Sequence, residues 1–122
     1  MICCFIWIFT ASTLPKVNSF HFSRELTLGM RTAVFCTVIK GDPPFTFLWF
    51  KDGKALQENH HLNMKSIDDF TSSLTITNLG PEHNGNYTCR VSNAAGHDEQ
   101  SDVLSMKGNL KTVSTICFYF YC

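Results

Sequence analysis

The chain has 122 residues, which is enough for one domain with a modest hydrophobic core and too few for two domains of ordinary size. Its lysine and arginine residues equal its aspartate and glutamate residues in number, ten of each, and both kinds are scattered along the chain. This balance excludes the basic stripe that would direct a protein to nucleic acid or to an acidic lipid surface.

The two ends of the chain differ in composition from its middle. Residues 1–14 contain an apolar run, 2–9, that is too short to span a bilayer and is typical of a secretory signal, although the basic residues that normally precede such a run are missing. We interpret residues 1–14 either as a signal peptide or as a leader produced by a gene-prediction or splicing artefact. Residues 108–122 form an aromatic tail that is also too short to span a membrane. For its two cysteines, Cys117 and Cys122, three alternatives stay open: a local pair, a link between chains, or free thiols.

Between these ends, apolar and polar residues alternate with a period of two, which is typical of half-buried β-strands. No stretch has the spacing of an amphipathic helix. Strands are expected over residues 20–22, 26–28, 33–39, 45–50, 62–66, 72–78, 86–92 and 100–106. Their number and spacing predict an all-β sandwich of two antiparallel sheets over residues 15–107.

Turn-forming residues separate the expected strands. Residues 41–44 (Gly-Asp-Pro-Pro) cannot continue a strand ladder, and residues 51–53 (Lys-Asp-Gly) favour a tight hairpin turn. A second hairpin turn is expected at residues 93–96, and residues 79–83 (Leu-Gly-Pro-Glu-His) indicate a short helical turn.

Four residues in the middle of the chain form a specific combination. Trp49 follows Cys36 by thirteen positions, and Tyr87 precedes Cys89 by two. This combination resembles the immunoglobulin sandwich, and the resemblance implies a disulfide between Cys36 and Cys89, a tryptophan packed on it, and a tyrosine hydroxyl bonded to the preceding turn. The alternative, zinc bound by the two cysteines, would require clustered ligands, and the sequence contains no C-x-x-C or H-x-x-x-H.

Longer motifs extend the resemblance from about residue 15 to residue 107. They are GDPP at 41–44, WFKDG at 49–53, SLTITNL at 73–79 and NYTCRVSNAAG at 86–96. Together they resemble the I-set immunoglobulin domains of the Dscam (Down syndrome cell adhesion molecule) family. The resemblance implies an extracellular adhesion or recognition domain, on the cell surface or secreted, that often binds identical copies and has no cofactor. One departure is noted: the family pattern D-x-G-x-Y-x-C commonly begins with aspartate, and we assign Asn84 to that position.

The alternation of strand side chains predicts which residues face solvent. Because Cys36 points into the core, its neighbours Phe35 and Thr37 point out; on the adjacent strand, Leu74 and Ile76 belong to the core. Their neighbours Ser73, Thr75 and Thr77 therefore point out. We predict that these five outward residues form a contact surface for another protein, expected to be a second copy of this chain. In the alternative interpretation, Phe35 is covered by the N-terminal strand near Phe20 or Phe22.

The second sheet is expected to present Leu48, Phe50, Thr88 and Arg90 to solvent. Residues 86–88 (Asn-Tyr-Thr) form an N-glycosylation sequon. Since Tyr87 points inward, Asn86 is expected to face outward on this sheet. A glycan there would cover part of the second sheet and leave the first sheet free.

Other site chemistry has no support in the sequence. His60 and His61 are adjacent and are expected to be solvated, and His21, His83 and His97 are isolated, so no metal site is predicted. No catalytic motif such as G-x-S-x-G or H-E-x-x-H is present, and no enzyme activity, cofactor, nucleic-acid partner or membrane span is expected. The favoured hypothesis is a self-associating adhesion module; a secreted immune-type binder of foreign ligands and a passive spacer domain are the alternatives.

Overall fold

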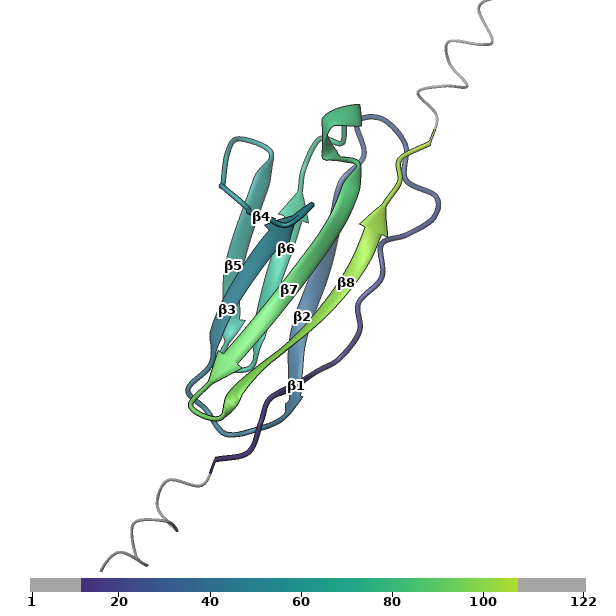
Figure 1. The fold of residues 1–122 in the computed structure, drawn as a ribbon. Coiled ribbons are helices and arrows are strands. Elements are labelled where there is room, and N and C mark those ends of the chain that lie inside the picture. The colour runs from purple at the N-terminus through teal and green to yellow at the C-terminus, as the bar shows by residue number, and fades with distance from the viewer. Residues whose placement is uncertain (1–11, 108–122) are drawn as a thin grey trace, which may run out of the picture.

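The structure is a computed structural model that describes residues 12–107. It consists of two four-stranded antiparallel sheets packed face to face (Figure 1). The first sheet has the strand order β1 (Lys16–Val17), β2 (Thr32–Lys40), β6 (Thr71–Ile76) and β5 (Leu62–Asp68). The second sheet has the order β4 (Lys54–Ala55), β3 (Thr46–Lys51), β7 (Gly85–Asn93) and β8 (Gly96–Leu104). The predicted all-β sandwich is confirmed. The expectations for the leader, apart from its last three residues, and for the tail with Cys117 and Cys122 lie outside the described residues.

Two of the expected strands, 20–22 and 26–28, are not strands. Residues 17–26, which we call the strap, continue from the end of β1 along the edge of β8, and residues 18–26 join no ladder (Figure 1). Beyond the strap, only an isolated bridge between Thr27 and Lys107 forms at 26–28. The alternation in the strap has a different cause: Phe20, Phe22 and Leu26 insert into the core, while the intervening residues face solvent. Conversely, β1 and β4 have only two residues each, too few to produce a periodic signal.

Side chains of β8 hold the strap in place. The main-chain N–H of Val17 donates to Asp98 Oδ2 at 2.8 Å, and the N–H of Phe22 donates to Asp102 Oδ2 at 2.9 Å. Between them, Gln100 Nε2 donates to the carbonyl oxygen of Val17 at 3.4 Å. These alternate β8 residues satisfy backbone groups that would otherwise need a strand partner. The strap therefore covers the β8 edge of the sandwich and is attached to it by hydrogen bonds between β8 side chains and the strap backbone.

The expected turns are present. Asp52 (φ 51°) and Gly53 (φ 84°) both adopt positive φ, as a two-residue type I′ turn requires, and they join β3 to β4. Asn93 Oδ1 accepts the N–H groups of Ala95 and Gly96 in the turn between β7 and β8. The short helical turn is a 3-10 helix, η1 (Pro81–His83).

The core lies between the two sheets and includes the aromatic residues of the strap. The ring of Phe20 lies 5.5 Å from that of Trp49, and the ring of Phe22 lies 5.4 Å from that of Tyr87, both in edge-on arrangements. Such aromatic pairs add to the stabilisation that comes from burial alone. The strap is therefore part of the hydrophobic core as well as its cover.

Within residues 12–107, no helix has the length and apolar character needed to cross a membrane.

Candidate recognition surfaces

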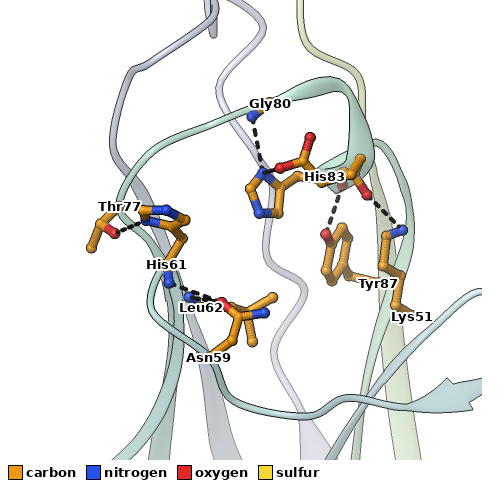
Figure 2. Close-up of polar contacts among 9 residues, drawn as sticks. Lys51, Asn59, His61, Leu62, Thr77, Gly80, His83 and Tyr87 are labelled. Atoms are coloured by element: carbon orange, nitrogen blue, oxygen red, sulfur yellow. Dashed lines mark hydrogen bonds and ion pairs between the residues drawn. The ribbon is translucent and has the colours of Figure 1, made fainter.

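Core residues connect the two sheets to each other and to the η1 turn. A disulfide joins Cys36 of β2 to Cys89 of β7, and both cysteines are fully buried. Trp49, which lies opposite Cys89 in the β3–β7 pair, is buried, and its indole N–H donates to Ser72 Oγ of the other sheet at 3.0 Å. The Tyr87 hydroxyl donates to the carbonyl oxygen of His83 at 2.6 Å, as Figure 2 shows. Leu74 and Ile76 are buried in the same core. This rigid interior fixes which side chains each sheet presents to solvent.

The first sheet presents a large apolar side chain near its centre. Phe35 of β2 is 53% exposed, and it lies opposite Ser73 of β6, which in turn lies opposite Lys65 of β5. The alternative that the strap covers Phe35 is wrong, because Phe20 and Phe22 are buried in the core. A half-exposed aromatic ring in the middle of a sheet is a feature of protein contact surfaces.

The other four residues predicted to belong to this surface are not equally accessible. Thr37 and Thr75 are half-buried, and Thr77, just beyond the end of β6, is exposed. Ser73 is only 6% exposed, so the prediction that it is available for contact is wrong. It lies on an inner strand between larger side chains on β2 and β5, and its hydroxyl is 3.4 Å from the carbonyl oxygen of Lys65. We therefore define the Phe35 face as the outer surface of this sheet formed by Phe35, Thr37, Lys65 and Thr75.

The outer surface of the second sheet has an ion pair beside its apolar side chains. Leu48 is 46% exposed, and beside it the guanidinium carbon of Arg90 lies 5.0 Å from the ring centre of Phe50. Arg90 also forms an ion pair with Glu99 at 3.5 Å. The aromatic ring on this sheet is therefore already engaged by a cation of the same chain.

The sequon lies on the second sheet. Asn86 is exposed on β7, and its main-chain N–H donates to Asp52 Oδ1 at 3.0 Å. The Thr88 hydroxyl lies 2.7 Å from that of Ser101 on β8. Because the side chain of Tyr87 points into the core between them, Asn86 and Thr88 share the outer surface of the sheet. Asn86 therefore lies on the opposite side of the sandwich from Phe35.

Within residues 12–107, no three histidine, cysteine or acidic side chains lie close enough together to hold a metal ion.

Comparison with known proteins gives the family. The chain matches the Immunoglobulin I-set domain family over residues 15–106. The chain belongs to the immunoglobulin I-set family. The I-set domain is 41% identical over 96 residues to the human cell adhesion molecule DSCAM, a match that covers 78% of this chain and 5% of DSCAM. It is 37% identical over 93 residues to Dscam2 of Drosophila melanogaster, covering 76% of this chain and 4% of that protein. The chain thus spans about a twentieth of the length of these relatives.

Solved structures agree with this assignment. The I-set domain resembles the Dscam1 Ig7 domain, isoform 5, with a TM-score of 0.73 and 25% identity, covering 76% of this chain and 96% of that one. It also resembles part of a structure of the eight N-terminal immunoglobulin domains of DSCAM, with a TM-score of 0.72 and 30% identity over 78% of this chain and 12% of that chain. Because the family consists of immunoglobulin domains and the relatives are adhesion molecules, the prediction that this domain is not an enzyme is confirmed.

One sequence assignment within the I-set pattern is wrong. Counting back from Cys89, the first position of D-x-G-x-Y-x-C is His83 and not Asn84. Asn84 instead accepts the main-chain N–H of Met106 through Oδ1, at 2.7 Å. His83 is isolated in sequence but is 6% exposed, and its Nδ1 accepts the N–H of Gly80 at 2.9 Å. The I-set domain therefore has a buried, hydrogen-bonded histidine that the motif count could have identified.

Proposed function

We propose that this I-set domain is an extracellular adhesion and recognition module, on the cell surface or secreted, that binds a second copy of itself through the Phe35 face. The similarity to Dscam adhesion molecules supports a role in adhesion. The observation that supports this face is the 53% exposure of Phe35 at the centre of a sheet, between threonine side chains. An aromatic anchor surrounded by small polar groups fits the core and rim of a protein interface.

The position of Phe35 suits a symmetric contact. In a two-fold dimer the same patch is used by both partners, so a central side chain lies close to the symmetry axis and packs against its own copy or the neighbouring threonines. Lys65 of β5 lies toward the rim, where its ammonium group stays solvated. The Arg90 and Glu99 pair of the second sheet would have to be desolvated in a comparable contact, which costs free energy.

Replacing Phe35 with aspartate is expected to weaken self-association by about thirtyfold or more, since an interface anchor is worth about 2 kcal/mol or more. The side chain is half-exposed, so the fold should be retained, which a thermal unfolding curve checks. Sedimentation equilibrium of the native chain and the variant measures the dissociation constant.

Leu48→Asp is the matched control, because Leu48 has a similar exposure, 46%, on the other sheet. It should leave the dissociation constant unchanged. A folded Phe35→Asp variant that associates like the native chain would rule out the Phe35 face. A native chain that stays monomeric at all concentrations would support the spacer hypothesis instead.

We also propose that Asn86 carries an N-linked glycan on the second sheet, which would leave the Phe35 face open. When the chain is secreted from eukaryotic cells, treatment with a peptide N-glycosidase is expected to reduce its mass. The Asn86→Gln variant should show no such shift and should self-associate as the native chain does. An unchanged mass of the secreted native chain after treatment would contradict this proposal.

A further inference from the structure

The η1 turn holds an ionisable ring inside the protein. His83 is buried, its Nδ1 accepts the N–H of Gly80, and its carbonyl oxygen accepts the hydroxyl of Tyr87 (Figure 2). Because Nδ1 is an acceptor, the neutral ring carries its proton on Nε2. The side chain thus closes the turn from Gly80 to His83 only in the neutral form.

The surroundings of this ring act on its protonation in both directions, and burial, which opposes protonation, has the largest effect. A proton on Nδ1 would face the donor N–H of Gly80, so this side-chain hydrogen bond would be lost and the turn would be closed only by main-chain bonds such as that from the His83 N–H to the Gly80 carbonyl oxygen at 3.0 Å. Burial, the largest cause, lowers the pKa of His83 from 6.5, and the positive charges of His61, just before β5, and Lys51, on β3, lower it further. The Glu82 carboxylate acts in the opposite direction from 3.9 Å, but it is mostly exposed and therefore screened. On β7, burial raises the pKa of Tyr87 to about 12, so its hydroxyl remains a neutral donor.

The residue after His83 links the turn to the end of the domain. The N–H of Asn84 donates to the carbonyl oxygen of Pro81 at 3.2 Å, while Asn84 Oδ1 accepts the N–H of Met106 at 2.7 Å. Figure 1 shows η1 at the end of the sandwich where β8 finishes. A conformational change in η1 therefore reaches the C-terminal end of the domain through the Asn84 side chain and its hydrogen bond to Met106.

We propose that His83 is a pH-sensitive lock, by which we mean that its neutral ring keeps the η1 turn closed. Proton uptake by the imidazole opens the turn and breaks the hydrogen bond from the Met106 N–H to Asn84 Oδ1 at the C-terminal end of the domain. The lock is independent of the Phe35 face, which lies on the first sheet, whereas η1 and Asn84 lead into β7 of the second. The direction of the pH effect follows from the difference in proton binding between the folded and the unfolded chain. Above pH 6.5 the ring is neutral in both the folded and the unfolded chain. Below pH 6.5 the unfolded chain binds the proton more readily, so the stability of the closed turn falls as the pH falls.

Hydrogen exchange of the 122-residue chain at pH 7.5 and pH 5.0 tests the proposal. After correction for intrinsic exchange rates, the protection of the Gly80 and Met106 amides is expected to be lower at pH 5.0 than at pH 7.5, because proton uptake by the His83 ring favours the open turn. In the His83→Asn variant, Oδ1 takes the place of Nδ1 as an acceptor and does not titrate, so protection should stay nearly constant. His97→Gln, which removes an exposed histidine from β8, should behave as the native chain does.

An equal loss of protection in His83→Asn and the native chain would overturn the proposal, and so would constant protection in the native chain. A second measurement uses only the native chain and so does not depend on the folding of the His83→Asn variant. The ring protons of His83 and the amide proton of Gly80 should titrate in NMR spectra with one shared midpoint below pH 6.5. A Gly80 amide signal that does not follow the His83 ring would show that protonation leaves the turn closed.

Discussion

Replacing Cys36 and Cys89 together with alanine is expected to lower the free energy of unfolding by about 4 kcal/mol. The disulfide closes a loop with a sequence separation of 53, and the chain-entropy relation gives about this value for such a loop. Domains of this size are stable by only about 5–15 kcal/mol, so the variant should be partly or largely unfolded at 37 °C. Urea unfolding of the two proteins, followed by tryptophan fluorescence, measures the difference.

The native chain and the double variant share the remaining four cysteines, so their comparison isolates the pair that joins the sheets. Reduction of the native chain with a thiol reagent provides an independent control and should move its urea midpoint toward that of the variant. A double variant within about 1 kcal/mol of the oxidised native chain would show that packing around Trp49, rather than the covalent link, provides the connection between the sheets.

The sequence was sufficient to predict the fold class because its signals are local. The period of two requires only neighbouring residues, and the combination of Cys36, Trp49, Tyr87 and Cys89 marks one strand of the first sheet and two of the second. The type I′ turn at Asp52 and Gly53 is likewise set by its own residues. The outward direction of the Phe35 side chain follows from that of Cys36 alone, because neighbouring side chains on a strand point to opposite faces of the sheet.

The predictions that failed depend on neighbours that are distant in sequence. Ser73 has the expected direction but is buried, because exposure depends on the side chains of the strands on both sides. The strap has strand-like alternation, but its backbone binds β8 side chains about eighty positions away, which no local pattern reveals. His83 is different: the tyrosine pattern places it six residues before Cys89, where our sequence-based assignment has Asn84, and its burial depends on the fold of η1.

Removing the two β8 carboxylates that bind the strap, by Asp98→Ala with Asp102→Ala, is expected to lower the free energy of unfolding by about 3 kcal/mol. Each carboxylate accepts a partly buried main-chain N–H, and a hydrogen bond to a charged group contributes about 1.5 kcal/mol or more. The variant would leave the N–H groups of Val17 and Phe22 without these acceptors. Because Phe22 packs against Tyr87, a looser strap would also weaken the core. Urea unfolding measures the total effect, and hydrogen exchange of the Val17 and Phe22 amides measures the local one.

Glu99→Ala is the matched control for the strap variant, because Glu99 also lies on β8 but faces solvent, where it pairs with Arg90. An exposed ion pair contributes less than about 1 kcal/mol, so this control should remain close to the native chain. Asp98→Asn with Asp102→Asn keeps an oxygen acceptor at each site without its charge and should lie between the two. If the alanine double variant unfolds at the same urea concentration as Glu99→Ala, the strap is held by the burial of Phe20 and Phe22, and its polar bonds to β8 contribute no net stability. If it unfolds earlier, with the strap amides losing protection first, the carboxylates of β8 are what attach the N-terminal segment to the sandwich.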